Sequence, residues 1–336
     1  MKANNHILIL FGAGASNGSE KEENYCPPLG KNLHIFCSEH SSDWKKALQI
    51  PTLGEILESY GFEKFMLELN KLNTDLFYKC HLDCARLLFK FLPTKENLYG
   101  IFVQRLLEMC SDATITLATL NYDRLLPLSL TDYGILPYSI NGIGNTDFKF
   151  PSFFLVDPTN CILKKRQKIE IILPHGASYL FTDSSFYNIP QEILELIEPD
   201  TEDPIIKNFF AQQHIEMFGR KIIPIHDEKK FMNKLSLYEH PAMSFIHEFK
   251  DTQGSGVPYV YYQRLYRLKE ISMSVDTIVV IGVNYQKHDK FWESILPSRA
   301  TKKIQFGGDI SIPDFQFNDL YFKHENFHEL INKIIK

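Results

Sequence analysis

The stretch that decides the fold is HILILFGAGASNG, residues 6–18. Residues 7–11 form a continuous apolar run, which is typical of a strand covered on both faces of a parallel sheet. The run breaks at Gly12 and Gly14, and such a turn lets backbone N–H groups approach a pyrophosphate closely. The third glycine of the usual dinucleotide-binding pattern would fall at Asn17, so the match is imperfect. A glycine turn that serves packing alone remains the alternative.

The rest of the chain alternates between strand-like and helix-like patterns. Short apolar and β-branched runs predict further strands at residues 113–119, 169–173 and 276–281, and we expect another at residues 302–306 (KKIQF). Apolar residues at helical spacing predict helices within residues 53–110, 260–273 and 327–335. We therefore expect an α/β fold, with a Rossmann-like parallel sheet and helices on both of its faces.

The length of 336 residues allows about two domains at roughly 150 residues each. No glycine- and serine-rich linker divides the sequence, however. We expect a single domain over residues 1–336, with helical insertions at about 53–110 and 183–250. The second insertion is polar and irregular, and we expect helices with long connections there.

Composition narrows the functional class. Hydrophobic residues make up 44% and charged residues 23%, as in ordinary soluble proteins. The formal net charge of −5 argues against a nucleic-acid-binding domain, so we expect no direct nucleic-acid binding. No apolar run has the ~20 residues of a membrane span, and no signal peptide is evident, so we expect a cytoplasmic protein without membrane contact. The six cysteines form no C-x-x-C pair, so we expect no zinc module and no other metal.

Polar residues and glycines follow the predicted strands where ligands bind in open parallel sheets, beyond the carboxyl ends. Asn121 and Asp123 follow the strand at 113–119, and both can accept hydrogen bonds from a ligand. His175 follows the strand at 169–173, and its side chain suits proton abstraction near neutral pH. Gly282 and Asn284 follow the strand at 276–281, where a glycine permits close approach of a nucleotide.

Each of these features also has a structural interpretation. Asn121 and Asp123 could cap a strand-to-helix turn. His175 is one of 12 histidines and could be a buried structural residue. Gly282 could simply form a turn. The four positions gain weight only from their common location at strand ends.

In chain order, the motifs Gly12-Ala13-Gly14-x-Ser16, Thr119-x-Asn121-x-Asp123, His175-Gly176 and Ile281-Gly282 resemble the sirtuin family. The segment Pro27-Pro28-Leu29-Gly30 is similar to a loop of the bacterial sirtuin-like branch. The motifs are short, but they span residues 7–289.

Departures from the family pattern bear on the activity. Deacylating sirtuins carry a zinc module with paired C-x-x-C motifs, whereas only Cys161 lies beyond Asp123 here. The chain also lacks the Pro-Asp-Phe-Arg segment of the deacylases, and the stretch between Asp123 and His175 is long and irregular. A deacylase is therefore disfavoured, and the chain resembles the sirtuin-like NAD hydrolases of bacterial phage-defence systems.

The resemblance implies a set of roles with NAD as the substrate. Asn121 and Asp123 would lie in the nicotinamide pocket, and His175 would be the general base. Two further groups would bind the rest of NAD: Gly12, Ala13, Gly14 and Ser16 at the phosphates and nearby ribose, and Gly282 and Asn284 at the adenosine half. No metal is implied.

The implied reaction is hydrolysis of the nicotinamide–ribose bond to give nicotinamide and ADP-ribose, which depletes NAD during infection. A non-catalytic module that senses NAD or ADP-ribose, an ADP-ribosyltransferase and an interaction-only protein remain alternatives. A free NAD hydrolase would kill its host, so its activity must be gated. We therefore expect a homo-oligomer and a separate regulatory protein such as an ATPase or a nuclease.

Overall fold

The computed structural model describes twelve segments of the chain, and the structural statements below concern these alone. They are residues 6–22, 25–110, 112–135, 139–140, 143–144, 168–186, 220–224, 227–236, 241–243, 267–285, 290–318 and 324–336. Much of the irregular stretch between Asp123 and His175, including Cys161, falls outside them.

The main sheet has eight strands in the order β11-β10-β9-β1-β2-β5-β3-β4. All neighbouring strands are parallel except β3 and β4, which form a short antiparallel pair at one edge. The strands are β1 (His6–Phe11), β2 (Thr114–Thr119), β3 (Ser139–Ile140), β4 (Ile143–Gly144), β5 (Lys168–Ile172), β9 (Thr277–Ile281), β10 (Lys302–Phe306) and β11 (Gln316–Asn318). The five predicted strands are confirmed to within one or two residues, and the predicted parallel sheet is confirmed with them.

Alternating side chains of the central strand enter two separate hydrophobic cores. Ile7, Ile9 and Phe11 belong to the core on one face of the sheet. Leu8 and Leu10 belong to the core on the other face. Complete burial of such a side chain contributes about 1.5–3 kcal/mol, which explains why this strand is apolar at every position after His6.

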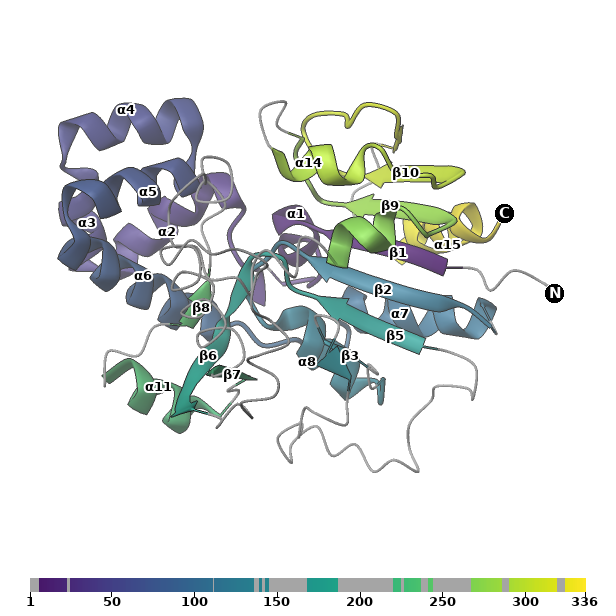
Figure 1. The fold of residues 1–336 in the computed structure, drawn as a ribbon, viewed down its shortest axis with the longest axis horizontal. Helices are drawn as coiled ribbons and strands as arrows, with labels where there is room; N and C mark the ends of the chain where they lie inside the picture. Colours follow the sequence, from purple (N-terminus) through teal and green to yellow (C-terminus); the bar gives the residue numbers. More distant parts are fainter. Residues whose placement is uncertain are drawn as a thin grey trace, which may run out of the picture.

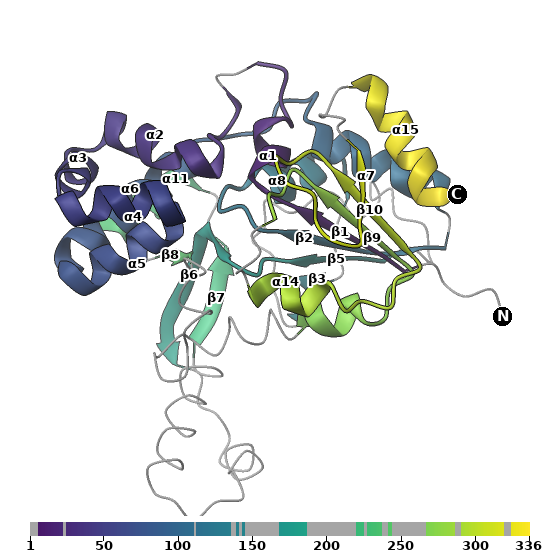
Figure 2. The ribbon, with the colours of Figure 1, turned by 90° about the horizontal axis from the view of Figure 1, so that it is seen from above.

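Helices cover both faces of the sheet, as predicted (Figure 2). α7 (Leu98–Met109), α8 (Leu125–Asp132) and α15 (His324–Ile335) contribute to the first core. α14 (Lys290–Ile295) and the helical segment at residues 267–272 contribute to the second core. α15 confirms the predicted closing helix, and residues 267–272 confirm the described part of the helix expected at 260–273.

A helical cluster lies to one side of the main sheet (Figure 1). We use this name for α2 (Leu33–His40), α3 (Ser42–Leu48), α4 (Pro51–Tyr60), α5 (Phe62–Leu72) and α6 (Thr74–Phe89). Trp44 stacks at the centre on Phe62 and Phe65, with ring centroids 5.5 and 5.8 Å away. Its indole N–H donates to the Cys80 carbonyl over 2.9 Å, so the buried polar atom of this side chain is satisfied.

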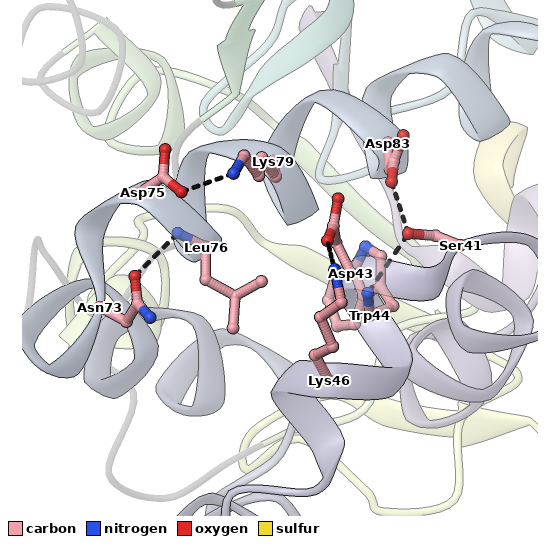
Figure 3. Close-up of polar contacts among 9 residues, drawn as sticks. All are labelled: Ser41, Asp43, Trp44, Lys46, Asn73, Asp75, Leu76, Lys79 and Asp83. Atoms are coloured by element: carbon pink, nitrogen blue, oxygen red, sulfur yellow. Dashed lines mark hydrogen bonds and ion pairs between the residues drawn. The ribbon is translucent and has the colours of Figure 1, made fainter.

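Side-chain caps define where the helices of the cluster begin (Figure 3). The Ser41 hydroxyl accepts from the Trp44 amide at the start of α3, and the same hydroxyl donates to Asp83 of α6. The Asn73 side chain accepts from the Leu76 amide at the start of α6. Each such cap contributes about 1 kcal/mol. The Ser41 contact also fastens α3 to α6.

A second, smaller sheet follows β5 in the chain. It consists of β6 (Gly176–Phe186) between β7 (Arg220–Pro224) and β8 (Pro241–Met243), and both pairings are antiparallel. The expectation of helices over 183–250 is therefore only partly correct. α11 (Glu228–Ser236) is helical, but β7, β8 and the end of β6 are strands. The short strands β7 and β8 are held by pairing with β6, which is distant in sequence, so local periodicity could not reveal them.

The helical cluster and the smaller sheet both lie beyond the carboxyl ends of the parallel strands (Figure 1). His81 of α6 contacts β8, with its Nε2 atom 3.4 Å from the Met243 carbonyl oxygen. Within the described residues, no helix is both long and apolar enough to cross a membrane. The division of residues 1–336 into one domain with insertions at 53–110 and 183–250 stays a prediction.

Candidate functional site

Four adjacent strands of the main sheet bring the predicted motifs together at the carboxyl ends of the strands. β9, β1, β2 and β5 are consecutive neighbours in the sheet and run parallel. Their carboxyl ends therefore meet beside α1 (Ala13–Asn17) (Figure 1). The chain leaves β1 toward β2 and later returns on the other side of β1 as β9. Such a reversal is the topological switch point at which open α/β sheets bind ligands.

The glycines after β1 and β9 let two backbones pack directly on each other. The Gly12 amide donates to the Ile281 carbonyl and the Gly14 amide donates to the Gly282 carbonyl, both over 2.9 Å. A Cβ atom on Gly12 would lie 2.6 Å from the Gly282 oxygen. Gly282 has a φ of +62°, and a Cβ atom there would lie 2.1 Å from the Ala15 nitrogen. These glycines therefore do serve backbone packing, as the structural alternative holds. The N–H groups of Gly12 and Gly14 donate to carbonyl groups of the protein itself.

Asn17 occupies the place of the third glycine in the expected pattern. Its side-chain amide donates to the Pro27 carbonyl over 2.9 Å. This contact ties α1 to the Pro27-Pro28-Leu29-Gly30 segment. Asn17 thus has a role of its own, and a glycine at this position would lose the contact.

A buried polar cluster lies between the ends of β1 and β2. We use this name for Ser16, Tyr99, Asn121 and Asp123, whose exposed fractions are all below 9%. The Asn121 side-chain nitrogen donates to the Gly12 carbonyl over 2.9 Å and to the Ser16 hydroxyl over 2.8 Å. It lies 3.3 Å from the Tyr99 hydroxyl, which is hydrogen-bonded to Ser16 over 2.9 Å. Residues from three separate segments thus form one hydrogen-bonded unit.

Burial shapes the electrostatics of this cluster. It raises the pKa of Asp123, while hydrogen bonds from the Leu125 amide and from Ser16 act in the opposite direction. Burial also raises the pKa of Tyr99 well above its usual value, and the nearby Asp123 carboxylate adds to that effect. Tyr99 is therefore a neutral phenol at physiological pH. The contact from Asp123 to Leu125 is the local capping interaction that the structural interpretation anticipated.

His175 lies directly after β5, and its side chain is 2% exposed. Its Nδ1 atom is 3.2 Å from the Leu120 carbonyl oxygen. Because a carbonyl can only accept, the proton sits on Nδ1, and Nε2 is the basic nitrogen. The ring packs near Tyr122 and Phe291, with centroids 6.3 and 5.8 Å away. His175 is thus anchored to the same β2 end that carries Asn121.

Asn284 lies outside the buried polar cluster. Its side chain is exposed, and its Oδ1 atom accepts from the Asp309 amide over 2.7 Å. Its Nδ2 atom donates to the Asp309 carboxylate over 3.2 Å. Lys31 approaches the same carboxylate at 3.5 Å. Asn284 therefore belongs to an exposed rim formed by the segments after β9 and β10.

Two residues of the site were not predicted from the sequence. Tyr99 falls within the stretch that helical periodicity marks only as apolar, so nothing distinguishes it from a core residue. Arg124 lies 3.6 Å above the ring of Phe89, which stacks at 3.7 Å on Phe231 of α11. Burial lowers the pKa of Arg124 to about 10, against the opposing influence of Glu228. Arg124 thus joins the β2 end to α6 and α11.

No group of three or more side chains suited to a metal ion occurs in the described segments.

No protein-family model matches the sequence, and no curated protein matches it either. The chain is similar to solved structures of Sir2 proteins. One is a variant of a Sir2 homologue in complex with ADP-ribose, at 14% identity and a TM-score of 0.41, covering 99% of this chain and 92% of that one. Another is a Sir2 protein with an inhibitor, 2′-O-acetyl-ADP-ribose and a deacetylated peptide, at 10% identity and a TM-score of 0.43, covering 98% and 92%. Similarity at this level carries no assignment of activity.

Proposed function

We propose that this protein is an NAD+ hydrolase that cleaves the nicotinamide–ribose bond to give nicotinamide and ADP-ribose. One observation carries the proposal. The segments after β9, β1, β2 and β5 meet at the switch point of the sheet, and the buried polar cluster lies there between the ends of β1 and β2. Ligand sites combine a few converging polar groups with buried surroundings, and in open α/β sheets they form beyond the strand ends at this position.

The orientation of Asn121 supports an acceptor role toward the substrate. Both of its amide protons have acceptors within the protein, namely the Gly12 carbonyl and the Ser16 hydroxyl. The side chain would therefore interact with a ligand through its Oδ1 atom. An oriented oxygen suits a reaction in which positive charge develops at the ribose C1′ atom. Asp123 adds a second acceptor in the same cluster.

The chemistry needs little acid catalysis, because nicotinamide leaves as a neutral molecule from a cationic ring. The bond between C1′ and nitrogen breaks with its electron pair going to nicotinamide, and the oxygen of water bonds to C1′. His175 accepts the proton from that water at Nε2 and returns it to solvent. Its Nδ1 contact with Leu120 supports this tautomer. General-base assistance of this kind contributes typically about 10²–10⁴-fold.

The binding roles follow the same arrangement. In this proposal, Gly12, Ala13, Gly14 and Ser16 lie along the phosphates and nearby ribose, and Gly282 and Asn284 lie along the adenosine half. The internal contacts of Gly12, Gly14 and Ser16 mean that they act mainly by holding the loop close to the substrate. Ala13, which is partly exposed, is then the residue of this loop nearest to the phosphates. No metal takes part in the proposed reaction.

The test is to incubate the purified protein with NAD and to quantify nicotinamide and ADP-ribose by chromatography. His175→Ala and Asn121→Ala should each fold yet lose cleavage. His40→Ala is a matched control, because His40 is an exposed histidine of α2 that contacts Phe36. Full activity in both site variants would contradict the assignment.

The same assay separates the alternative activities. NAD binding without nicotinamide release would identify a sensing module. Transfer of labelled ADP-ribose to a polypeptide would identify an ADP-ribosyltransferase.

We further propose that the hydrolase acts in the cytoplasm in anti-phage defence, as a homo-oligomer gated by a separate regulatory protein such as an ATPase or a nuclease. Unregulated NAD loss would be lethal to the cell, so the activity has to be gated. Gel filtration with an activity assay across the eluted fractions tests the gating. A fully active monomer would contradict it.

A further inference from the structure

Tyr99 is a fully packed aromatic residue with a polar end in the candidate site. It lies in the first turn of α7 and is 1% exposed. Its ring and the ring of Phe11 in β1 form a T-shaped pair, with centroids 4.9 Å apart and planes at 87°. A phenylalanine would make the same ring contacts, so packing does not explain the hydroxyl group.

The hydroxyl group is placed by a firm attachment of α7 to the segment after α1. Asn97 caps α7 by accepting from the Tyr99 amide over 3.0 Å. Its side-chain nitrogen donates to Glu20 over 2.6 Å and lies 3.1 Å from the Ser19 hydroxyl. The backbone of Leu98 also donates to the Ser19 carbonyl over 2.8 Å. The position of Tyr99 is therefore set by several contacts that do not involve its own side chain.

Burying a hydroxyl group is unfavourable unless it is hydrogen-bonded. Among the described residues, the partners of the Tyr99 hydroxyl belong to the buried polar cluster, with Ser16 Oγ at 2.9 Å and Asn121 Nδ2 at 3.3 Å. Both partners are predicted site residues. The hydroxyl group thus contacts Asn121 itself and Ser16, which is one of the two acceptors of the Asn121 amide.

We propose that Tyr99 is a positioning residue for Asn121 in the proposed NAD hydrolysis. Its hydroxyl group fixes the Ser16 hydroxyl and the Asn121 amide nitrogen, and this holds Asn121 Oδ1 toward the substrate. The inference rests on the proposed function and extends it to a residue outside the four strand-end motifs. It predicts that the main effect falls on the chemical step, since the contacts proposed for the adenosine half of NAD are untouched.

Tyr99→Phe tests the inference, with Tyr133→Phe as the matched control. Tyr133 lies just after α8, and its hydroxyl group donates to the Lys95 carbonyl over 2.8 Å, outside the buried polar cluster. Both variants remove one phenol hydroxyl and keep the ring. For Tyr99→Phe we expect kcat for nicotinamide release to fall about five- to thirtyfold with KM nearly unchanged, as for the loss of one orienting hydrogen bond. Tyr133→Phe should keep both constants.

A second measurement makes the result independent of NAD cleavage. The side-chain amide signals of Asn121 can be assigned in a nitrogen–proton NMR spectrum by their loss in Asn121→Asp. They should shift or broaden in Tyr99→Phe and stay in place in Tyr133→Phe. Unchanged signals would overturn the positioning role even if the protein is an active hydrolase. If the wild-type protein releases no nicotinamide but the signals respond as expected, the proposed function fails while the positioning of Asn121 stands.

Discussion

Asn121 and Asn284 follow strands on either side of β1, yet their surroundings differ. Asn121 is buried, and its side chain bonds to residues far away in the sequence. Asn284 is exposed, and its side chain bonds only to Asp309 among the contacts of the described residues. The same sequence feature, an asparagine at a strand end, thus forms part of a rigid inner cluster in one case and of an exposed rim in the other. Function that depends on exact orientation belongs to the first environment.

The largest effect on stability is expected at Gly282, which lies between the buried polar cluster and the exposed rim. Gly282→Ala forces a left-handed conformation on alanine and places its Cβ atom against the backbone of α1. We expect the free energy of unfolding to fall by about 3 kcal/mol, from backbone strain and overpacking together. Chemical denaturation of the wild type and of Gly282→Ala measures this difference in the free energy of unfolding.

Gly54→Ala is the matched control for this substitution. Gly54 lies inside α4, and a Cβ atom there would meet nothing within 4 Å. Alanine should stabilise that helix by about 0.5–1 kcal/mol. Equal effects at the two glycines would show that the close approach of the two strand-end backbones is unimportant.

The next largest effect is a change in the pH dependence of stability, and it comes from Asp123 in the buried polar cluster. Burial raises the pKa of Asp123 in the folded protein above its value of 3.8 in the unfolded chain. The folded state therefore binds the proton more tightly, and stability falls as pH rises through the interval between the two values. Asp123→Asn removes this dependence, so its stability relative to the wild type should increase across that interval and then level off.

Urea unfolding at a series of pH values measures this difference. Asp309→Asn, at the exposed rim, is the control, because it also removes one carboxylate but leaves the buried polar cluster intact. If the stability of the wild type instead rises with pH through this interval relative to Asp123→Asn, the pKa of Asp123 is not raised on folding. NAD cleavage by Asp123→Asn, assayed in parallel, separates its contribution to stability from its contribution to activity.

The sequence predicted the central framework well because that framework is local in pattern. The apolar and β-branched runs at β1, β2, β5 and β9 predict buried strands, and parallel order then places their carboxyl ends together. It did not predict Tyr99, because a buried tyrosine on an apolar helix face looks like any core residue. Arg124 and the smaller sheet were missed for a related reason. Their places depend on partners distant in the chain, such as Phe89 for Arg124.

The smallest effect is expected at the rim, from Asn284→Ala. The exposed contacts to Asp309 are each weak, since water replaces them readily, so the free energy of unfolding should change by less than about 0.5 kcal/mol. If Asn284 contacts the adenosine half of NAD, KM should rise severalfold while kcat stays constant, because a contact remote from the breaking bond contributes equally to substrate and transition state.

Asn121→Ala should show the opposite pattern, with a loss of kcat and a stability cost of about 1–3 kcal/mol from the polar groups left unpaired. Steady-state kinetics on the two alanine variants compares them directly. A fall in kcat for Asn284→Ala would mean that the rim takes part in the chemical step, and the distinction between the two environments would then fail.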